Sequence, residues 1–394
     1  MRNKTTKIIS ILIILFAIIS VAGCEKIDKE AELELLNWAE EVGLDKDESS
    51  KTLYRRALEE EGGKVVIYSI SSRMTRIKES FERDYPGMTL EVYDINANDL
   101  STKLKTEYNA GIRTADVVHS KEQTGDYVNN FFNQGILHNY QPKSIFKNVN
   151  PQYLEELTPL YIESDWWFYN DKVYSQAPID NWWDLTKPEW KGKFVLQDPT
   201  STVSYMALFT AMSQNNKQME KAYEEAFGEP IKLDEDEPSA THAWIKRILA
   251  NDPIIFESNN EVIQAVGEGE KSYLLGYTPS SKYREKVDKN WNIEAVNHGM
   301  KPSSGAVFMN FLAVVDQAPH PQGAKLLIRY LLGDEDGNGD GIQPFNTIGG
   351  WPVRPETIPA EGNIPLDELE VWMLDYDYIY THIQDIQDYW YEKR

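Results

Sequence analysis

Short runs of hydroxyl-bearing and basic side chains recur in the chain, after strand-like segments or before helix-like ones. Hydroxyl groups, the cations Arg73, His119 and Lys121, and the free backbone N–H groups at helix N-termini all donate hydrogen bonds. Such donors favour anionic or oxygen-rich ligands, and the planar guanidinium of Arg73 suits a phosphate or a carboxylate. The candidate binding residues are Ser71, Ser72, Arg73, His119, Ser120, Lys121, Thr200, Ser201, Thr202, Asn259, Ser303 and Ser304. A simpler explanation is that several of these hydroxyls only cap their own helices.

Two tryptophan pairs, Trp166-Trp167 and Trp182-Trp183, offer flat apolar faces that could stack on a sugar ring. Bulky aromatic residues also fill cores wherever parts of a protein meet. We expect the second pair to be core, and we keep Trp167, together with Tyr277, as a candidate ligand contact.

An acidic segment near residue 335 resembles a calcium loop, with Gly339 in its sixth position. Oxygen ligands at alternate positions suit a hard cation. The twelfth position holds Phe345 where such loops carry a bidentate glutamate, so a solvated acidic turn explains the segment equally well. The residues that could bind a structural calcium are Asp334, Asp336, Asn338 and Asp340.

Motifs for catalysis are scarce. The sequence has no His-Glu-x-x-His, Gly-x-Ser-x-Gly or Gly-x-x-x-x-Gly-Lys-Ser/Thr motif. Nothing places two acidic residues opposite each other as a glycosidase requires. We therefore predict a protein that is not an enzyme, with a secreted carbohydrate-active enzyme as the rival hypothesis.

The elements that would position these residues begin with Lys64 to Tyr68, a β-branched run typical of a buried strand. A helical pattern up to Tyr85, a strand from Thr89 to Asp94, a helix from about Asn98 to Asn109 and a strand from Ala115 to His119 follow. This alternation predicts an α/β lobe with a mostly parallel sheet. Ligands of such sheets bind beyond the carboxyl ends of the strands.

The N-terminal residues have the pattern of a secretory leader, with three basic residues before an apolar run from Ile8 to Ala22. The run ends in Val21-Ala22-Gly23-Cys24, which resembles a lipobox, so we expect Cys24 to be acylated and to become the first residue of the mature protein. Cys24 is also the only cysteine among 394 residues, which excludes an intramolecular disulfide.

The formal net charge is -23, which argues against a nucleic-acid ligand because phosphate backbones require clustered Lys and Arg. Net charge does not determine the sign of a small ligand, since a pocket can differ locally from the body. Hydrophobic residues make up 41% of the chain, enough at this length for two lobes.

The chain from about Gly63 to Pro355 resembles the extracellular solute-binding proteins of ABC importers, in particular the branch with the ferric-ion-binding periplasmic proteins. This resemblance implies the type II periplasmic-binding-protein fold, in which two α/β lobes joined by crossing strands close over a ligand in the cleft. The segments that carry it are Val66–Ser69, Phe81–Gly87, Thr114–Val118, Trp182–Lys193, Val195–Pro199, Glu268–Gly269–Glu270, Ser272–Thr278 and Pro352–Pro355.

Ferric-binding members of that family usually present two neighbouring tyrosines as iron ligands. Here Tyr277 and Tyr283 are separated, with Ser280 and Ser281 between them. This departure argues against iron as the main ligand. A ferric ion or a polyamine remains the alternative. We predict a sugar or a phosphorylated or otherwise anionic small molecule.

The expected organisation is a leader (1–23), an acidic tether or helical spacer (24–62), lobe 1 (63–165), lobe 2 (166–295) and a return to lobe 1 (296–344). C-terminal helices (345–394) should pack mainly on lobe 2. The resemblance implies a receptor outside the cytoplasm that delivers its solute to the permease of an ABC importer; a membrane sensor is the other conceivable recipient. We expect a monomer, held at the outer face of the membrane by the lipid on Cys24.

Overall fold

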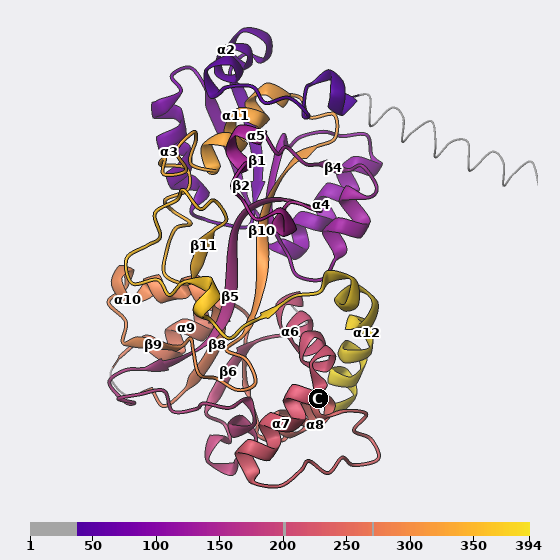
Figure 1. Cartoon of the computed structure of the whole chain (residues 1–394), viewed down its shortest axis with the longest axis vertical. Helices are drawn as coiled ribbons and strands as arrows, with labels where there is room; N and C mark the ends of the chain where they lie inside the picture. Colours follow the sequence, from indigo (N-terminus) through magenta and orange to yellow (C-terminus); the bar gives the residue numbers. More distant parts are fainter. Residues whose placement is uncertain (1–37, 200–201, 270–271) are drawn as a thin grey trace, which may run out of the picture.

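The computed structural model describes residues 38–199, 202–269 and 272–394. Two α/β lobes lie end to end along the long axis, and two long strands run between them (Figure 1). Several sequence predictions fall outside the described residues: the leader (1–23), Cys24, the first part of the expected spacer (25–37), and Thr200, Ser201 and Glu270. Within the described part of the chain, no helix combines the length and the apolar character needed to span a bilayer.

Lobe 1 is built on three parallel strands, β1 (Lys64–Ser69), β2 (Thr89–Asp94) and β3 (Val117–Glu122). Helix α3 (Met74–Asp84) follows β1, and helix α4 (Ala97–Asn109) follows β2. This arrangement confirms the predicted parallel sheet. The β-branched run of β1 fits a strand buried on both faces, as parallel sheets require.

Strand β5 (Thr158–Asn170) connects the two lobes and is buried along its whole length. Its first half pairs with β10 (Ala306–Val315) and β11 (Gly350–Pro352) in lobe 1. Its second half pairs with β8 (Leu275–Pro279) and β9 (Ile293–Val296) in lobe 2. The sheet therefore runs without interruption through both lobes, in the strand order β2-β1-β3-β10-β5-β8-β6-β7.

Lobe 2 contains the parallel strands β6 (Phe194–Gln197) and β7 (Ile254–Phe256) beside β8. Its core includes Trp182 and Trp183, whose indole N–H groups donate to the carbonyl oxygens of Ser303 and Met219 at 2.8 Å and 2.9 Å. The helices of this lobe are α6 (Val203–Gln214), α7 (Asn216–Phe227), α8 (Ala240–Ala250) and α9 (Asn259–Gly267). The C-terminal helix α12 (Tyr376–Lys393) packs on α6 and α8.

Shorter elements complete the described chain. They are η1 (Val128–Phe132), β4 (Leu137–His138), α5 (Lys143–Phe146), η2 (Pro151–Tyr153), η3 (Trp182–Thr186), η4 (Pro188–Trp190), η5 (Ser280–Arg284), α10 (Glu285–Asp288), η6 (Leu366–Glu368) and β12 (Trp372–Met373).

Helix α2 (Ser50–Glu61), which we expected in a spacer, packs against α11 (Pro321–Leu331) of lobe 1. It buries Leu53 and Ala57 completely. The preceding residues Asp47 and Glu48 form ion pairs with basic side chains of α11. Residues 47–61 are therefore part of lobe 1, because they bury apolar side chains against α11 and supply the carboxylates that pair with its buried basic residues.

Candidate functional site

The two lobes touch through a chain of hydrogen bonds beside the crossing strands. Lys121 Nζ of lobe 1 donates to Ser204 Oγ, at the start of α6 in lobe 2, at 2.9 Å. Ser204 Oγ in turn donates to Gln123 Oε1 of lobe 1 at 2.8 Å. Polar groups of both lobes thus meet at the carboxyl end of β3, where we expect a cleft ligand to bind.

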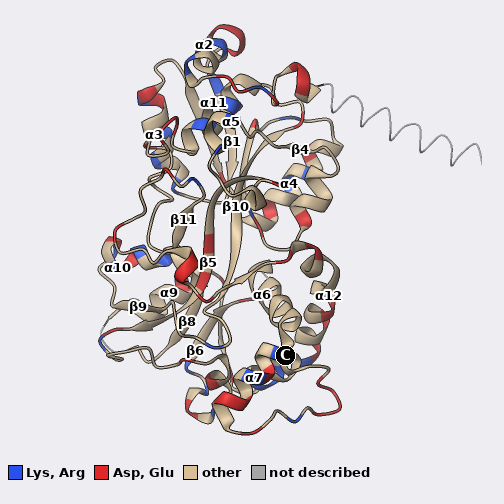
Figure 2. Ribbon diagram, in the orientation of Figure 1, with Lys and Arg blue, Asp and Glu red and all other residues tan. Residues whose placement is uncertain are grey.

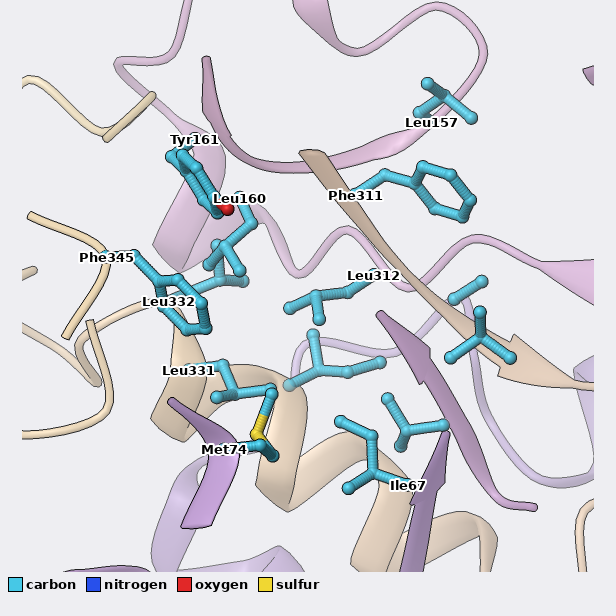
Figure 3. Packing of buried hydrophobic residues seen from close by; sticks show 14 of the residues in the cluster. Ile67, Met74, Leu157, Leu160, Tyr161, Phe311, Leu312, Leu331, Leu332 and Phe345 are labelled. Carbon is cyan, nitrogen blue, oxygen red and sulfur yellow. The ribbon is translucent and has the colours of Figure 1, made fainter. Parts of the chain in front are cut away.

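Arg73 lies just before α3 and is held by neutral acceptors. Its guanidinium donates to Ser71 Oγ at 3.1 Å, to the Pro344 carbonyl at 3.1 Å and to the Tyr161 hydroxyl at 3.3 Å. It also lies 4.9 Å from the ring centroid of Phe345, which stacks on Tyr161. Figure 3 shows Tyr161 and Phe345 side by side. Within the described ranges, no carboxylate forms an ion pair with Arg73.

Two further cations, Lys282 and Arg284, come from η5 of lobe 2, directly after β8. Lys282 Nζ donates to Asn260 Oδ1, and Arg284 donates to the Ser281 carbonyl at 2.7 Å. The one carboxylate that pairs with Arg284 is that of Glu285, at 3.4 Å, among the residues that the structure describes.

The three cations are close enough to act on one another. Burial lowers the pKa of Lys282 to about 8; the positive charges of Arg284 and Arg73 lower it as well, and the negative charges of Glu285 and Glu163 oppose this effect. Burial and the charge of Arg73 also lower the pKa of Arg284, again against the charges of Glu285 and Glu163. Cations from both lobes therefore share one partly buried region, which we call the cation cluster (Arg73, Lys282 and Arg284).

Two carboxylates, Glu163 and Asp165, lie on β5 between the lobes; Figure 2 shows acidic residues in the middle of this strand. Each residue is 6% exposed. Alternation along the strand places both on the same face as Tyr161. Burial raises the pKa of Asp165 to about 7, against the opposing effect of the positive charge of Lys121.

His119 does not add a positive charge to this region, contrary to the expectation from sequence. Its ring is completely buried, and Nδ1 lies 2.9 Å from Ser69 Oγ. Burial lowers the pKa of His119 to about 3, and the charge of Arg73 acts in the same direction. The imidazole is neutral at neutral pH.

β3 extends to Glu122, so His119, Ser120 and Lys121 lie inside the strand and not after it. Side chains alternate along a strand, and only Lys121 of the three reaches lobe 2. Ser120 points away and donates to the Tyr127 hydroxyl at 2.9 Å.

The other predicted hydroxyl and amide residues lie at the edges of the site or cap helices. Thr202 accepts a hydrogen bond from the Ser204 backbone N–H at the start of α6, and Ser303 Oγ donates to the Gly305 carbonyl at 2.7 Å. Ser72 is exposed and Ser304 is buried, whereas Asn259 begins α9, which Ser258 caps. Helix capping thus explains the position of Thr202, one of the predicted binding residues, without a ligand.

Trp167 and Tyr277 lie in the aromatic core of lobe 2, with exposed fractions of 1% and 2%. Their ring centroids are 5.2 Å apart, and Trp167 also packs edge-on against Trp182 and Phe194. The Tyr277 carbonyl accepts a hydrogen bond from the Tyr205 hydroxyl. The structure does not bring these two rings to the cation cluster.

The four side chains of the acidic loop contact separate partners. Asp334 accepts from the hydroxyls of Ser50 and Tyr85, and Asp340 pairs with Arg83. Asp336 and Asn338 bond to each other through the Asn338 backbone N–H. No group of three or more His, Cys, Asp or Glu residues in the described ranges could hold a metal ion. Calcium binding here stays a prediction.

Sequence reasoning did not select Glu163, Asp165, Ser204, Lys282 or Arg284 as site residues. Two signals could have found the charged ones. Glu163 and Asp165 are acidic residues at alternate positions of an otherwise mostly apolar strand. Lys282 and Arg284 follow the end of β8, where a cleft ligand is expected.

A model of the bacterial extracellular solute-binding proteins matches residues 76–362 of this chain. No curated protein sequence matches it.

Similar solved structures include iron-bound HitA from Pseudomonas aeruginosa (16% identity, 84% of this chain and 99% of that chain, TM-score 0.64). AfuA from Actinobacillus pleuropneumoniae, with fructose-6-phosphate bound, has 17% identity over 84% of this chain and 98% of that chain, with a TM-score of 0.63. The apo ferric ion-binding protein A from Pasteurella haemolytica has 17% identity with the same coverages and a TM-score of 0.62. These similarities confirm the type II periplasmic-binding-protein fold.

Proposed function

Because the chain belongs to the bacterial extracellular solute-binding proteins, we propose that it is the receptor of an ABC importer for a small anionic solute, such as a phosphorylated sugar. The receptor acts outside the cytoplasm as a monomer. It closes its lobes over the solute and delivers the solute to the importer's permease.

The observation that carries this proposal is the cation cluster. Arg73 of lobe 1 and Lys282 and Arg284 of lobe 2 lie near one another with neutral acceptors and few carboxylates. Partly buried cations whose hydrogen-bond acceptors are mostly neutral are costly, and like charges that approach each other add to the cost. An anion between the lobes would relieve both costs. Its binding would therefore favour the closed state.

The same charges disfavour the alternative ligands. Of the similar proteins, HitA is described as iron-bound and AfuA as bound to fructose-6-phosphate. At the cation cluster itself a ferric ion or a polyamine would be repelled and a phosphate attracted, although Glu163 and Asp165 lie on the strand beside it. We therefore favour a phosphorylated or otherwise anionic solute over a ferric ion or a polyamine.

Native mass spectrometry of freshly purified protein tests this function. We expect a bound small anion, and small-angle scattering should show a more compact protein when that anion is added back to the stripped protein. A bound metal ion or polyamine would contradict the proposed ligand class. An unchanged radius despite confirmed binding would contradict closure of the lobes.

We further propose that a lipid on Cys24 holds the receptor at the membrane, as the lipobox-like sequence before it suggests. Cys24→Ala should move the protein from the membrane fraction to the soluble fraction without changing its melting temperature. Recovery of Cys24→Ala in salt-washed membranes would contradict the anchor.

A further inference from the structure

We propose that Glu163 and Asp165 form a second subsite, which binds hydrogen-bond donors of the same ligand whose anionic group lies at the cation cluster. This inference rests on the proposed function and narrows its substrate class. The ligand would carry a phosphoryl group at one end and an ammonium group or hydroxyl groups at the other.

The two carboxylates lie at the position where β5 passes from one lobe to the other. Ser164 pairs with Val307 of β10 in lobe 1, and the next residue, Asp165, pairs with Pro279 of β8 in lobe 2. Glu163 and Asp165 therefore flank the junction of the lobes. A ligand bound between the lobes would pass directly over them.

The backbone at this junction is tightly packed. A Cβ atom on Gly305 would lie 2.5 Å from the Asp165 carbonyl oxygen and 2.8 Å from Ser164 Oγ. The carboxylates are thus attached to a strand that has little room to shift. This rigidity suits residues that must select a ligand by its geometry.

Each carboxylate has a buried oxygen without a hydrogen-bond donor. Within the described part of the chain, Oε1 of Glu163 and Oδ1 of Asp165 have no partner. The other oxygen of Glu163 accepts only a long hydrogen bond from Asn310 Nδ2, at 3.5 Å. Leaving a buried acceptor unpaired costs about 1–3 kcal/mol, and more when it is charged. A donor on the ligand would remove this cost.

Three basic side chains of this region already donate to other groups. Lys121 Nζ donates to Ser204, Arg73 to Ser71, Pro344 and Tyr161, and Arg284 to Ser281. A phosphate dianion offers only acceptors, which suit the cation cluster and not the carboxylates. Donors on another part of the ligand would therefore complete the hydrogen bonding of the two carboxylates.

Calorimetry on the purified protein with three phosphate esters tests the subsite. The esters are 2-aminoethyl phosphate, which adds an ammonium group, glycerol 3-phosphate, which adds hydroxyl groups, and ethyl phosphate, which adds neither. At least one of the first two should bind about 10-fold tighter than ethyl phosphate, as one hydrogen bond to a charged group predicts. The tighter of the two identifies the donor.

Asp165→Ala and Glu163→Ala should each reduce this advantage about 10-fold while changing the affinity for ethyl phosphate less than threefold. Asp165→Asn should affect 2-aminoethyl phosphate more than glycerol 3-phosphate, because an amide oxygen still accepts from a hydroxyl. Asp367→Asn, at an exposed carboxylate, is the matched control. Thermal melts check that each variant folds, and Glu163→Ala provides the test if Asp165→Ala does not fold.

Equal affinities for the three esters, or an advantage that survives in both variants, would overturn the subsite. Failure of all three esters to bind would also overturn it. In that last case, a different small anion found by native mass spectrometry would leave the proposed function standing and refute only the narrower ligand class.

Discussion

Two groups of basic residues in this protein, one fully buried and one partly buried, have different surroundings. On α11, Lys325 and Arg329 have exposed fractions of 0% and 1%. Carboxylates partner both of them: Lys325 Nζ lies 2.6 Å from Glu48, and Arg329 lies 2.5 Å from Glu335 and 3.4 Å from Asp47. The cation cluster has mostly carbonyl, hydroxyl and amide acceptors instead.

The difference also appears in the lysine pKa values. Burial lowers the pKa of Lys325, and the hydrogen bond with Glu48 and its negative charge oppose that effect. Burial also lowers the pKa of Lys282, to about 8; neighbouring cations lower the pKa of both lysines, but Glu285 and Glu163 oppose this at Lys282 through their charge alone, without a hydrogen bond. A protein neutralises the cations that only hold its fold together. Cations that remain unmatched in a cleft are available for a ligand.

The largest expected effect is a loss of stability when Lys325, a buried cation with a carboxylate partner, is replaced. Lys325→Met removes one of the two basic partners of Glu48, the other being Arg56, and one donor to the backbone carbonyls of residues 42–43. Breaking a buried pair from one side costs about 3–5 kcal/mol. Urea denaturation at pH 7 should show this loss, with ligand affinity within threefold of the unmodified protein.

Lys105→Met, at an exposed lysine of α4, is the control and should change the free energy of unfolding by less than about 0.5 kcal/mol. If Lys325→Met lowered the free energy of unfolding by less than about 1 kcal/mol, the proposed difference between the α11 cations and the cation cluster would be contradicted.

The next largest effect is a loss of ligand affinity when a residue of the cation cluster is replaced. Arg73→Ala should weaken affinity for the co-purified anion about 10- to 100-fold, because charge-assisted hydrogen bonds contribute about 1.5–3 kcal/mol. The free energy of unfolding should fall less than in Lys325→Met, since the partners of Arg73 are neutral. Calorimetry and urea denaturation measure the two quantities.

Arg76→Ala removes the same charge from an exposed position of α3 and is the matched control for Arg73→Ala. Equal losses of affinity in the two variants would indicate a general charge effect, and would contradict a specific role of Arg73.

The smallest effect near neutral pH concerns Lys282. Its pKa of about 8 lies below the ordinary 10.5, and a bound anion should raise it again. Affinity should therefore fall by up to about tenfold per pH unit above pH 8, as the free protein loses this proton. Calorimetry between pH 6 and pH 9.5 measures the profile.

Lys282→Met should bind more weakly but without this decline above pH 8. Stability changes in the opposite sense: between about pH 8 and the ordinary pKa, the unfolded chain binds more protons than the folded protein, so the free energy of unfolding rises with pH. A Lys282→Met profile that matches the unmodified protein would contradict an anion at this lysine.

Local patterns in the sequence were sufficient for much of the fold. The β-branched run of β1 and the helical spacing of apolar residues in α3 both correspond to elements of the structure. Burial of both faces of β5 favours a continuous apolar run, and its acidic residues interrupt that run. The sequence analysis treated the tryptophans of this strand as candidates and did not consider the carboxylates beside them.

The sequence by itself determined the α/β class, the parallel strands of lobe 1 and Arg73 as a candidate, because these follow from the periodicity and type of neighbouring residues. The tertiary structure decided which charges are matched. Glu48 meets Lys325 across a separation of 277 residues, whereas no carboxylate of the described chain pairs with Arg73. Burial of His119 and Trp167 was also a tertiary outcome. Pairing and desolvation depend on residues distant in sequence, and they decide whether a basic residue supports the fold or can bind a ligand.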